Sequence, residues 1–255
     1  MGARRLTEWV VLGSGSYEPS LRGVRFPAGH ALLHSGRALL FDLGFGDLQQ
    51  LLRAGIDPAR VTHAFFTHRH PDHVGDLAAL LFMRHCARPR TRGTLRLFGP
   101  PGFKAFLRRL SAAHAPWLAP RGGGLRVTEL RSGGEVAGPG WKVRAHAVPH
   151  GTPALAYRFD AGKAAVCYSG DTGADPGLAA FAAGADLFVL ECSLTDDEDH
   201  PQHLRVKEAV ALFEASGARR GLFTHLSGAS LRQLAPRLRK LRASAAEDLQ
   251  RVRIG

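Results

Sequence analysis

Short apolar runs separated by glycine-rich or polar turns dominate the chain, and segments with helical periodicity alternate with them in its second half. Near the N-terminus, residues 31–34 and 37–42 predict a hairpin across Ser35 and Gly36. The apolar run 61–67 suits a buried strand that leads directly into His68. Further strands are predicted over 10–12, 95–98, 125–130, 142–148, 154–159, 164–169, 187–190 and 221–224. Helices are predicted over 48–54, 77–83, 103–110, 177–183, 204–215 and 231–241.

The order of these elements indicates the fold class. Hairpins come first and strand–helix alternation follows, which favours α/β layers over a purely parallel sheet. The two halves have a similar makeup, and each contains turns that lead from a strand to a histidine. This predicts two sheets packed together with helices outside. No low-complexity linker or short repeat divides the chain, so residues 1–255 are interpreted as a single domain.

Composition is that of an ordinary globular protein. The chain has 255 residues, of which 45% are hydrophobic and 22% charged, enough to bury a substantial core. No apolar run approaches the roughly 20 residues needed to cross a bilayer. The apolar stretch 9–12 is too short for the core of a signal peptide. We therefore expect a cytoplasmic protein without a membrane partner.

The three cysteines exclude two further classes of site. Cys86, Cys167 and Cys192 are widely spaced and odd in number, and they form no CxxC pair. Neither a disulfide framework nor a thiolate zinc site is indicated. Small buried core residues are the favoured interpretation.

The net charge of +12 has two interpretations. Clustered arginines and lysines neutralise phosphates, which would indicate an anionic partner such as RNA. A broad compositional bias toward arginine would raise the charge without any partner. The densest basic stretch is 84–96, with Lys104, Arg108 and Arg109 beyond it. Both interpretations stay open at the level of sequence.

The run His68-Arg69-His70-Pro71-Asp72-His73 is the strongest chemical signal. Its three imidazoles and one carboxylate cannot all point at one ion from a regular helix or strand. In a tight turn at a strand end they can fan out toward two adjacent ions. Imidazole nitrogen and carboxylate oxygen are donors that Zn²⁺ accepts, with Mn²⁺ or Fe²⁺ as alternatives. A solvated histidine-rich loop is the disfavoured alternative.

Three distant residues are candidate partners of this motif. His150, Asp171 and His225 each follow a predicted strand, and ligands at strand ends are held by a rigid scaffold. His146 competes with His150 from the same strand, although Pro149 and Gly151 favour a turn at His150. Asp171 has the alternative of a turn residue or helix cap, and His225 that of an ordinary strand-end histidine.

The HxHxDH pattern after an apolar strand resembles the signature of the metallo-β-lactamase superfamily. That resemblance implies a four-layer αββα sandwich of two mixed sheets. Within the superfamily, the chain is most similar to the ribonuclease Z-like branch of phosphodiesterases. The segments that carry this likeness, besides the motif itself, are 12–16, 39–44, 98–100, 168–172 and 223–227.

The resemblance also implies a role for each ligand. One metal would be bound by His68, His70 and His150, the other by Asp72, His73 and His225, and Asp171 would bridge the two. Two such ions can share a water, lower its pKa and polarise a phosphoryl or carbonyl group. Asp72 would accept the proton of that water.

A separate acid is needed to protonate the leaving group. Glu191 and His203 resemble the ribonuclease Z-like pattern in which a glutamate supports a catalytic histidine. We therefore expect His203 to act as the general acid, oriented by Glu191. The alternative is that His203 is an ordinary helix-start residue beside the acidic loop 196–199.

Three departures from the branch bear on the substrate. The long basic arm that grips tRNA is missing, because the glycine-bearing stretch 114–124 is far too short for it. Gly228-Ala229-Ser230 replaces the usual Arg-Tyr after the last histidine motif, and His30 stands where a small hydroxyl residue is expected. These departures favour a smaller substrate, or RNA that is gripped differently.

The leading hypothesis is a phosphodiesterase that uses two divalent metal ions on a nucleotide-like or other phosphodiester substrate. A second hypothesis keeps the site but changes the chemistry to hydrolysis of a lactone, thioester or β-lactam carbonyl. A third is a non-catalytic nucleic-acid-binding protein. The oligomeric state is open, with a homodimer as one alternative.

Overall fold

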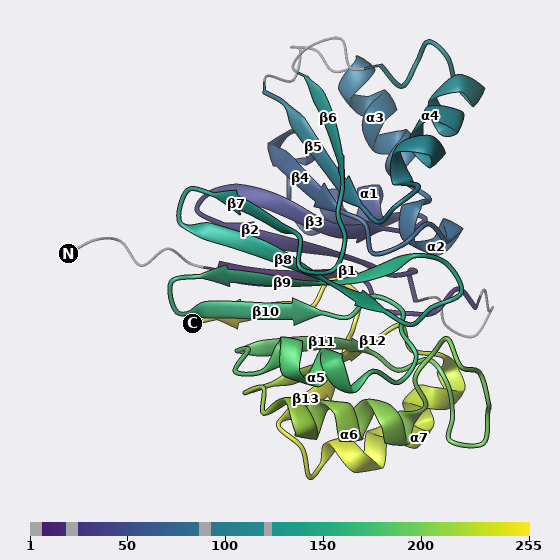
Figure 1. Cartoon of the computed structure of the whole chain (residues 1–255), viewed down its shortest axis with the longest axis vertical. Helices are drawn as coiled ribbons and strands as arrows, with labels where there is room; N and C mark the ends of the chain where they lie inside the picture. Colours follow the sequence, from purple (N-terminus) through teal and green to yellow (C-terminus); the bar gives the residue numbers. More distant parts are fainter. Residues whose placement is uncertain (1–6, 19–24, 87–92, 120–123) are drawn as a thin grey trace.

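Two mixed seven-stranded sheets pack face to face, and helices cover the outer face of each (Figure 1). The computed structural model describes residues 7–18, 25–86, 93–119 and 124–255. The predicted four-layer α/β sandwich is confirmed. No helix in these described ranges is both long enough and apolar enough to span a bilayer.

The first sheet comes mostly from the N-terminal half of the chain. Its strands, in spatial order, are β14 (Arg251–Ile254), β1 (Thr7–Gly13), β2 (Gly29–His34), β3 (Arg37–Leu43), β4 (Val61–Phe65), β5 (Leu95–Gly99) and β6 (Leu125–Glu129). Neighbours from β14 to β3 are antiparallel, and those from β3 to β6 are parallel.

The second sheet repeats this arrangement. Its strands, in spatial order, are β13 (Ala243–Ala245), β12 (Gly221–Thr224), β11 (Leu187–Glu191), β10 (Ala164–Tyr168), β9 (Ala154–Ala161), β8 (Trp141–Val148) and β7 (Glu135–Gly138). Strands β7 to β10 are antiparallel and β10 to β13 are parallel. Each sheet therefore has a parallel half whose strands end at a common edge.

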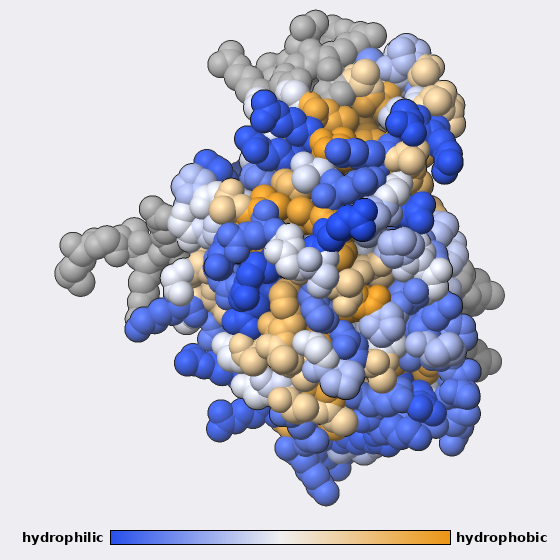
Figure 2. Space-filling model, in the orientation of Figure 1, coloured by the Kyte–Doolittle hydropathy of each residue, from blue (hydrophilic) through white to orange (hydrophobic). Residues whose placement is uncertain are grey.

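Helices on the two outer faces bury the remaining apolar surface. The first sheet is covered by α1 (Asp47–Arg53), α3 (Leu77–Cys86) and α4 (Phe103–Ala113), and the second by α5 (Pro176–Ala182), α6 (Val206–Ser216) and α7 (Gly228–Leu238). Figure 2 shows a surface that is largely hydrophilic, with apolar side chains gathered around β5, β6 and α3.

Aromatic side chains fill the space between the sheets. Phe65 stacks on Phe41 and Phe98, with ring centroids 5.2 and 4.7 Å apart. Trp9 packs against both Phe41 and Tyr168, which belong to opposite sheets. This central core fixes the distance between the sheets, and with it the distance between ligands that come from different sheets.

Several local expectations need correction. Strands β7, β13 and β14 were not predicted, because each has only three or four residues and lies at a sheet edge. The expected tight turn after His70 is the one-turn helix α2 (Pro71–Val74), which Pro71 starts at its first position. Cys86 is exposed rather than buried, whereas Cys167 and Cys192 are buried as expected. Residues 87–92 of the basic stretch and 120–123 of the glycine-bearing segment lie outside the described residues.

Candidate metal centre

All seven predicted ligands lie together where strands of both sheets end. His68 and His70 follow β4, and α2 carries Asp72 and His73. The other three follow strands of the second sheet, namely His150 after β8, Asp171 after β10 and His225 after β12. Two clusters have ligand atoms within 4.8 Å of one another: His68, His70, His150 and Asp171 in one, and Asp72, His73 and His225 in the other.

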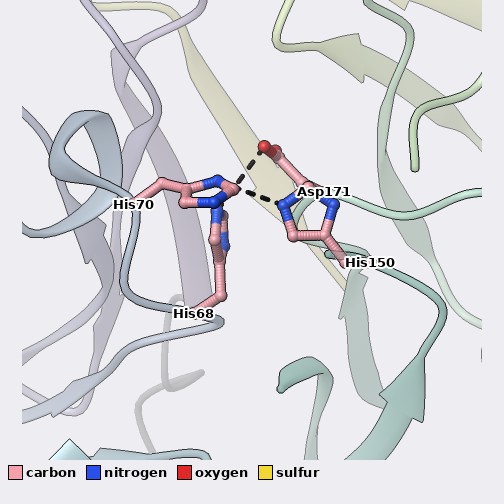
Figure 3. A group of neighbouring side chains, drawn as sticks. All are labelled: His68, His70, His150 and Asp171. Carbon is pink, nitrogen blue, oxygen red and sulfur yellow. Dashed lines mark hydrogen bonds and ion pairs between the residues drawn. The ribbon is translucent and has the colours of Figure 1, made fainter. Parts of the chain in front are cut away.

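The first cluster joins the two sheets. His150 Nε2 is 3.1 Å from His70 Nδ1, and His68 Nε2 is 3.7 Å from Asp171 Oδ2. Figure 3 shows His68 and His70 on one side, facing Asp171 and His150 on the other. Nδ1 of His150 is 2.9 Å from the carbonyl oxygen of Gln202, which fixes the ring so that Nε2 points into the cluster.

The second cluster shares Asp171 with the first. Asp72 Oδ2 is 3.5 Å from His225 Nε2 and 3.7 Å from His73 Nε2. The other carboxylate oxygen of Asp171, Oδ1, is 3.2 Å from His73 Nε2 and 3.5 Å from His225 Nε2. One oxygen of Asp171 thus faces each cluster.

The chemistry of these atoms fits divalent metal ions. His68 Nε2, His73 Nε2 and Asp171 Oδ1 are buried without a hydrogen-bond partner. Buried polar atoms are normally paired, because leaving them unpaired costs free energy. A cation between them removes that cost, and nitrogen and carboxylate oxygen are the donors that such a cation prefers. The group binds a divalent metal.

Electrostatics favour the protonation state that metal binding needs at three of the five candidate ligand histidines. Burial lowers the pKa of His68, His70 and His150, which favours the neutral imidazole. Burial alone would raise the pKa of Asp171, but the positive charges of His225 and His73 lower it well below its usual range. Asp171 is therefore an ionised carboxylate in the interior.

The two predicted proton-transfer residues adjoin the clusters. His203 Nδ1 is 2.9 Å from Glu191 Oε1 and 4.0 Å from Asp171 Oδ2. Glu191, at the end of β11, is fully buried and accepts hydrogen bonds from Thr172 N and Ser193 Oγ. Burial would lower the pKa of His203, but the hydrogen bond and charge of Glu191 raise it to about 9. His203 thus carries a proton that Glu191 stabilises.

Two further histidines that the sequence analysis singled out, His146 as an alternative to His150 and His30 as a departure from the family pattern, lie outside the clusters. His146 Nε2 is 2.8 Å from Asp175 Oδ2, outside both clusters. His30 is buried in the central core, where its ring packs on Trp9 and Tyr168. Burial lowers the pKa of His30 to about 3, so it stays neutral there.

Comparisons with known proteins show the family of the chain. A family model described as a beta-lactamase superfamily domain matches residues 37–226. The chain belongs to the β-lactamase superfamily. The likeness of its motifs to the metallo-enzymes of that superfamily, and to their ribonuclease Z-like branch, is confirmed.

Relatives and solved structures match this chain over nearly its whole length. A protein named ribonuclease Z from Ignicoccus hospitalis is 28% identical to it, over 96% of this chain and 97% of its own length. The fold matches the metallo-beta-lactamase fold protein YhfI from Bacillus subtilis, with a TM-score of 0.82 and 19% identity over 98% of this chain and 100% of that one. It also matches the short form of human tRNase Z, with a TM-score of 0.78 and 22% identity over 97% and 99% of the two chains.

The sequence did not identify one residue that supports the candidate metal centre. Asp42 is the second-last residue of β3 and is buried, with its backbone in the left-handed region at φ 59°. Its Oδ2 accepts hydrogen bonds from Thr67 Oγ1 at 2.7 Å and Tyr168 OH at 2.9 Å, and lies 2.9 Å from His73 Nδ1. A lone carboxylate at the end of an apolar strand was the available signal. Asp42 orients His73 so that Nε2 faces Asp171.

Replacing Asp42 with asparagine is expected to weaken metal binding by about 10–100-fold, because an oriented imidazole is a better ligand. Competition against a chelator measures this affinity directly. Tyr168→Phe is the matched control, since it removes one hydrogen bond to Asp42 and leaves the contact with His73. Equal metal affinities for wild type and Asp42→Asn would remove Asp42 from the support of the centre.

Proposed function

We propose that this chain is a dinuclear metal-dependent phosphodiesterase of ribonuclease Z-like type, and that residues 1–255 act as one catalytic domain. The observation that carries the proposal is the position of Asp171, with one carboxylate oxygen directed to each of two ligand clusters. The relative from Ignicoccus hospitalis is named ribonuclease Z, and the human structural neighbour is named tRNase Z. Both names support hydrolysis of a phosphodiester.

Each cluster holds one divalent ion in this proposal. His68, His70 and His150 hold the first, Asp72, His73 and His225 hold the second, and Asp171 contacts both. Zn²⁺ suits this nitrogen-rich set best, with Mn²⁺ and Fe²⁺ as alternatives. When bound, two such ions lower the pKa of a shared water and neutralise charge on the phosphate.

The protein side chains handle the protons. Asp72 has an exposed edge, with 19% of its side chain accessible, and accepts the proton of the attacking water. His203 donates its proton to the leaving oxygen from the other side of Asp171, and Glu191 holds the ring in place through Nδ1. The free atom of His203 for this donation is Nε2. Asp72 therefore acts as the general base and His203 as the general acid, at opposite ends of the scissile bond.

His203 has a second possible role as a ligand, since Asp171, His203 and His225 also offer atoms within 4.8 Å of one another. The 2.9 Å contact between Nδ1 and the buried Glu191 favours the acid role, because it stabilises the protonated ring. Metal content of a His203 variant separates the two roles.

The substrate class follows from the same geometry and from the short stretch 114–124. We infer that small phosphodiesters, or the ends of RNA chains, reach the centre without a dedicated arm. Metal-loaded protein is expected to hydrolyse bis(p-nitrophenyl) phosphate and to leave a panel of lactones and thioesters intact. Chelation should abolish this activity, and added Zn²⁺ should restore it. Turnover of lactones with no turnover of the phosphodiester would replace the proposal by carbonyl hydrolysis.

A further inference from the structure

A second cavity, of about 400 Å³, lies at the end of the strands remote from the metal centre. Its walls include Arg37 at the start of β3, residues 61–63 at the start of β4, and Trp141 at the start of β8. The metal-binding residues follow the opposite ends of β4 and β8. A strand rises about 3.3 Å per residue, so the five residues from His63 in β4 to His68 beyond its end place the cavity up to roughly 16 Å from the centre.

The lining of this cavity is basic. Arg37, Arg84 and Arg96 all contribute to it, and none of the thirteen lining residues that the structure describes is Asp or Glu. Arg37 and Arg96 are exposed at its rim, whereas Arg84 is only 3% exposed. The cavity therefore gathers three positive charges without a carboxylate in its wall.

Arg84 is the least expected of the three. Its Nη1 and Nη2 donate to the carbonyl oxygens of Val61 and Gly93 at 3.4 and 3.1 Å, and its Nε is buried without a partner. The two carbonyl groups satisfy donors but do not neutralise the charge. Buried charges are normally paired, because leaving one unpaired in the interior costs free energy. If Arg84 only linked β4 to Gly93, nothing would offset the free-energy cost of burying its charge.

The pKa of His63 reflects the positive electrostatic potential in the cavity. It is 8% exposed, with Nδ1 2.8 Å from Thr62 Oγ1 and its ring edge-on to Trp141 at 5.0 Å. Burial and the positive charges of Arg96 and Arg37 lower the pKa of His63 to about 4. The guanidinium groups at the rim thus act on the interior of the cavity, as a site for an anion requires.

We propose that this cavity binds the phosphate group of a small phosphorylated ligand of about mononucleotide size. Guanidinium groups present planar pairs of donors that match phosphate oxygens. The volume falls at the low end of the range of small-molecule sites, which is about 300–1,000 Å³. The site is separate from the metal centre and does not depend on the function proposed for that centre.

The test is calorimetric titration of the metal-loaded protein with adenosine 5′-monophosphate, with adenosine as the uncharged probe. Wild type is expected to show a binding event that Arg37→Gln/Arg96→Gln weakens at least tenfold, and adenosine should not show this event. Any binding of the phosphate at the metal centre should be the same in both proteins. Arg37 and Arg96 are exposed, so their replacement should leave the fold intact. Circular dichroism checks that the variant is folded.

The double variant Arg232→Gln/Arg239→Gln is the matched control, since it removes the same charge from two exposed positions, one on α7 and one at its C-cap. It should bind the monophosphate as wild type does. Turnover of bis(p-nitrophenyl) phosphate should be unchanged in both double variants. Equal isotherms for wild type and Arg37→Gln/Arg96→Gln would overturn the proposal. So would binding of RNA that depends on Arg37 and Arg96 when the monophosphate does not bind.

Discussion

Replacing Asp171 with asparagine is expected to lower turnover of bis(p-nitrophenyl) phosphate by about 10³-fold or more. The carboxylate supplies an oxygen to each ligand cluster, and its loss removes the negative charge that the two proposed ions would share. A metal ion contributes several kcal/mol to transition-state stabilisation, and about 1.4 kcal/mol corresponds to a factor of ten in rate. Metal content measured on the same samples should fall below that of wild type.

Asp175→Asn is the matched control for this experiment. Asp175 lies four residues further on and contacts His146 outside both clusters. Its replacement should leave turnover and metal content close to those of wild type. An Asp171→Asn variant with full metal content and full turnover would contradict the assignment of Asp171 as the shared ligand.

Replacing His203 with alanine is expected to slow hydrolysis of a phosphodiester with an alkoxide leaving group by about 10²–10⁴-fold. The variant loses the proposed proton donor beside Asp171 but keeps all seven proposed ligands, so metal content should stay at the wild-type level. Turnover of bis(p-nitrophenyl) phosphate should fall much less, because its leaving group departs without a proton. Steady-state kinetics on the two substrates measure this difference.

Two further variants refine the role of His203. His200→Ala removes a neighbouring exposed histidine and should leave both activities unchanged. The negative charge of Glu191 raises the pKa of His203. Glu191→Gln keeps the shape of this side chain but removes its charge, so the pKa of His203 should fall. Activity that needs the protonated ring is lost as the pH rises through this pKa. The alkaline limb of the pH profile should therefore move to lower pH in Glu191→Gln. An unimpaired His203→Ala variant would remove this residue from the mechanism.

The elements predicted from the sequence are those with strong periodicity. The apolar run that becomes β4 and the hairpin of β2 and β3 were predicted because buried strands need continuous or alternating apolar residues. Edge strands such as β14, at 251–254, bury little and carry a weaker signal. Its pairing with β1 depends on contacts across more than 240 residues of chain, as between Thr7 and Ile254, which local pattern does not contain.

The candidate site divides in the same way. The HxHxDH motif is local, so His68 to His73 could be assigned from spacing alone. His150, Asp171 and His225 needed both a strand-end position and the family resemblance, since His146 had a similar local signal. The role of Asp42 could not be predicted, because its contacts with Thr67, His73 and Tyr168 form only when the two sheets pack. Residues that support ligands are defined by packing rather than by motif.

Anomalous X-ray diffraction at the zinc absorption edge, from crystals of protein purified with Zn²⁺, locates the bound metal ions. We expect two peaks, one among His68, His70 and His150 and the other among Asp72, His73 and His225, with Asp171 beside both. A zinc-loaded crystal with no anomalous peak among these side chains, or with its zinc bound elsewhere on the chain, would overturn the proposed metal centre.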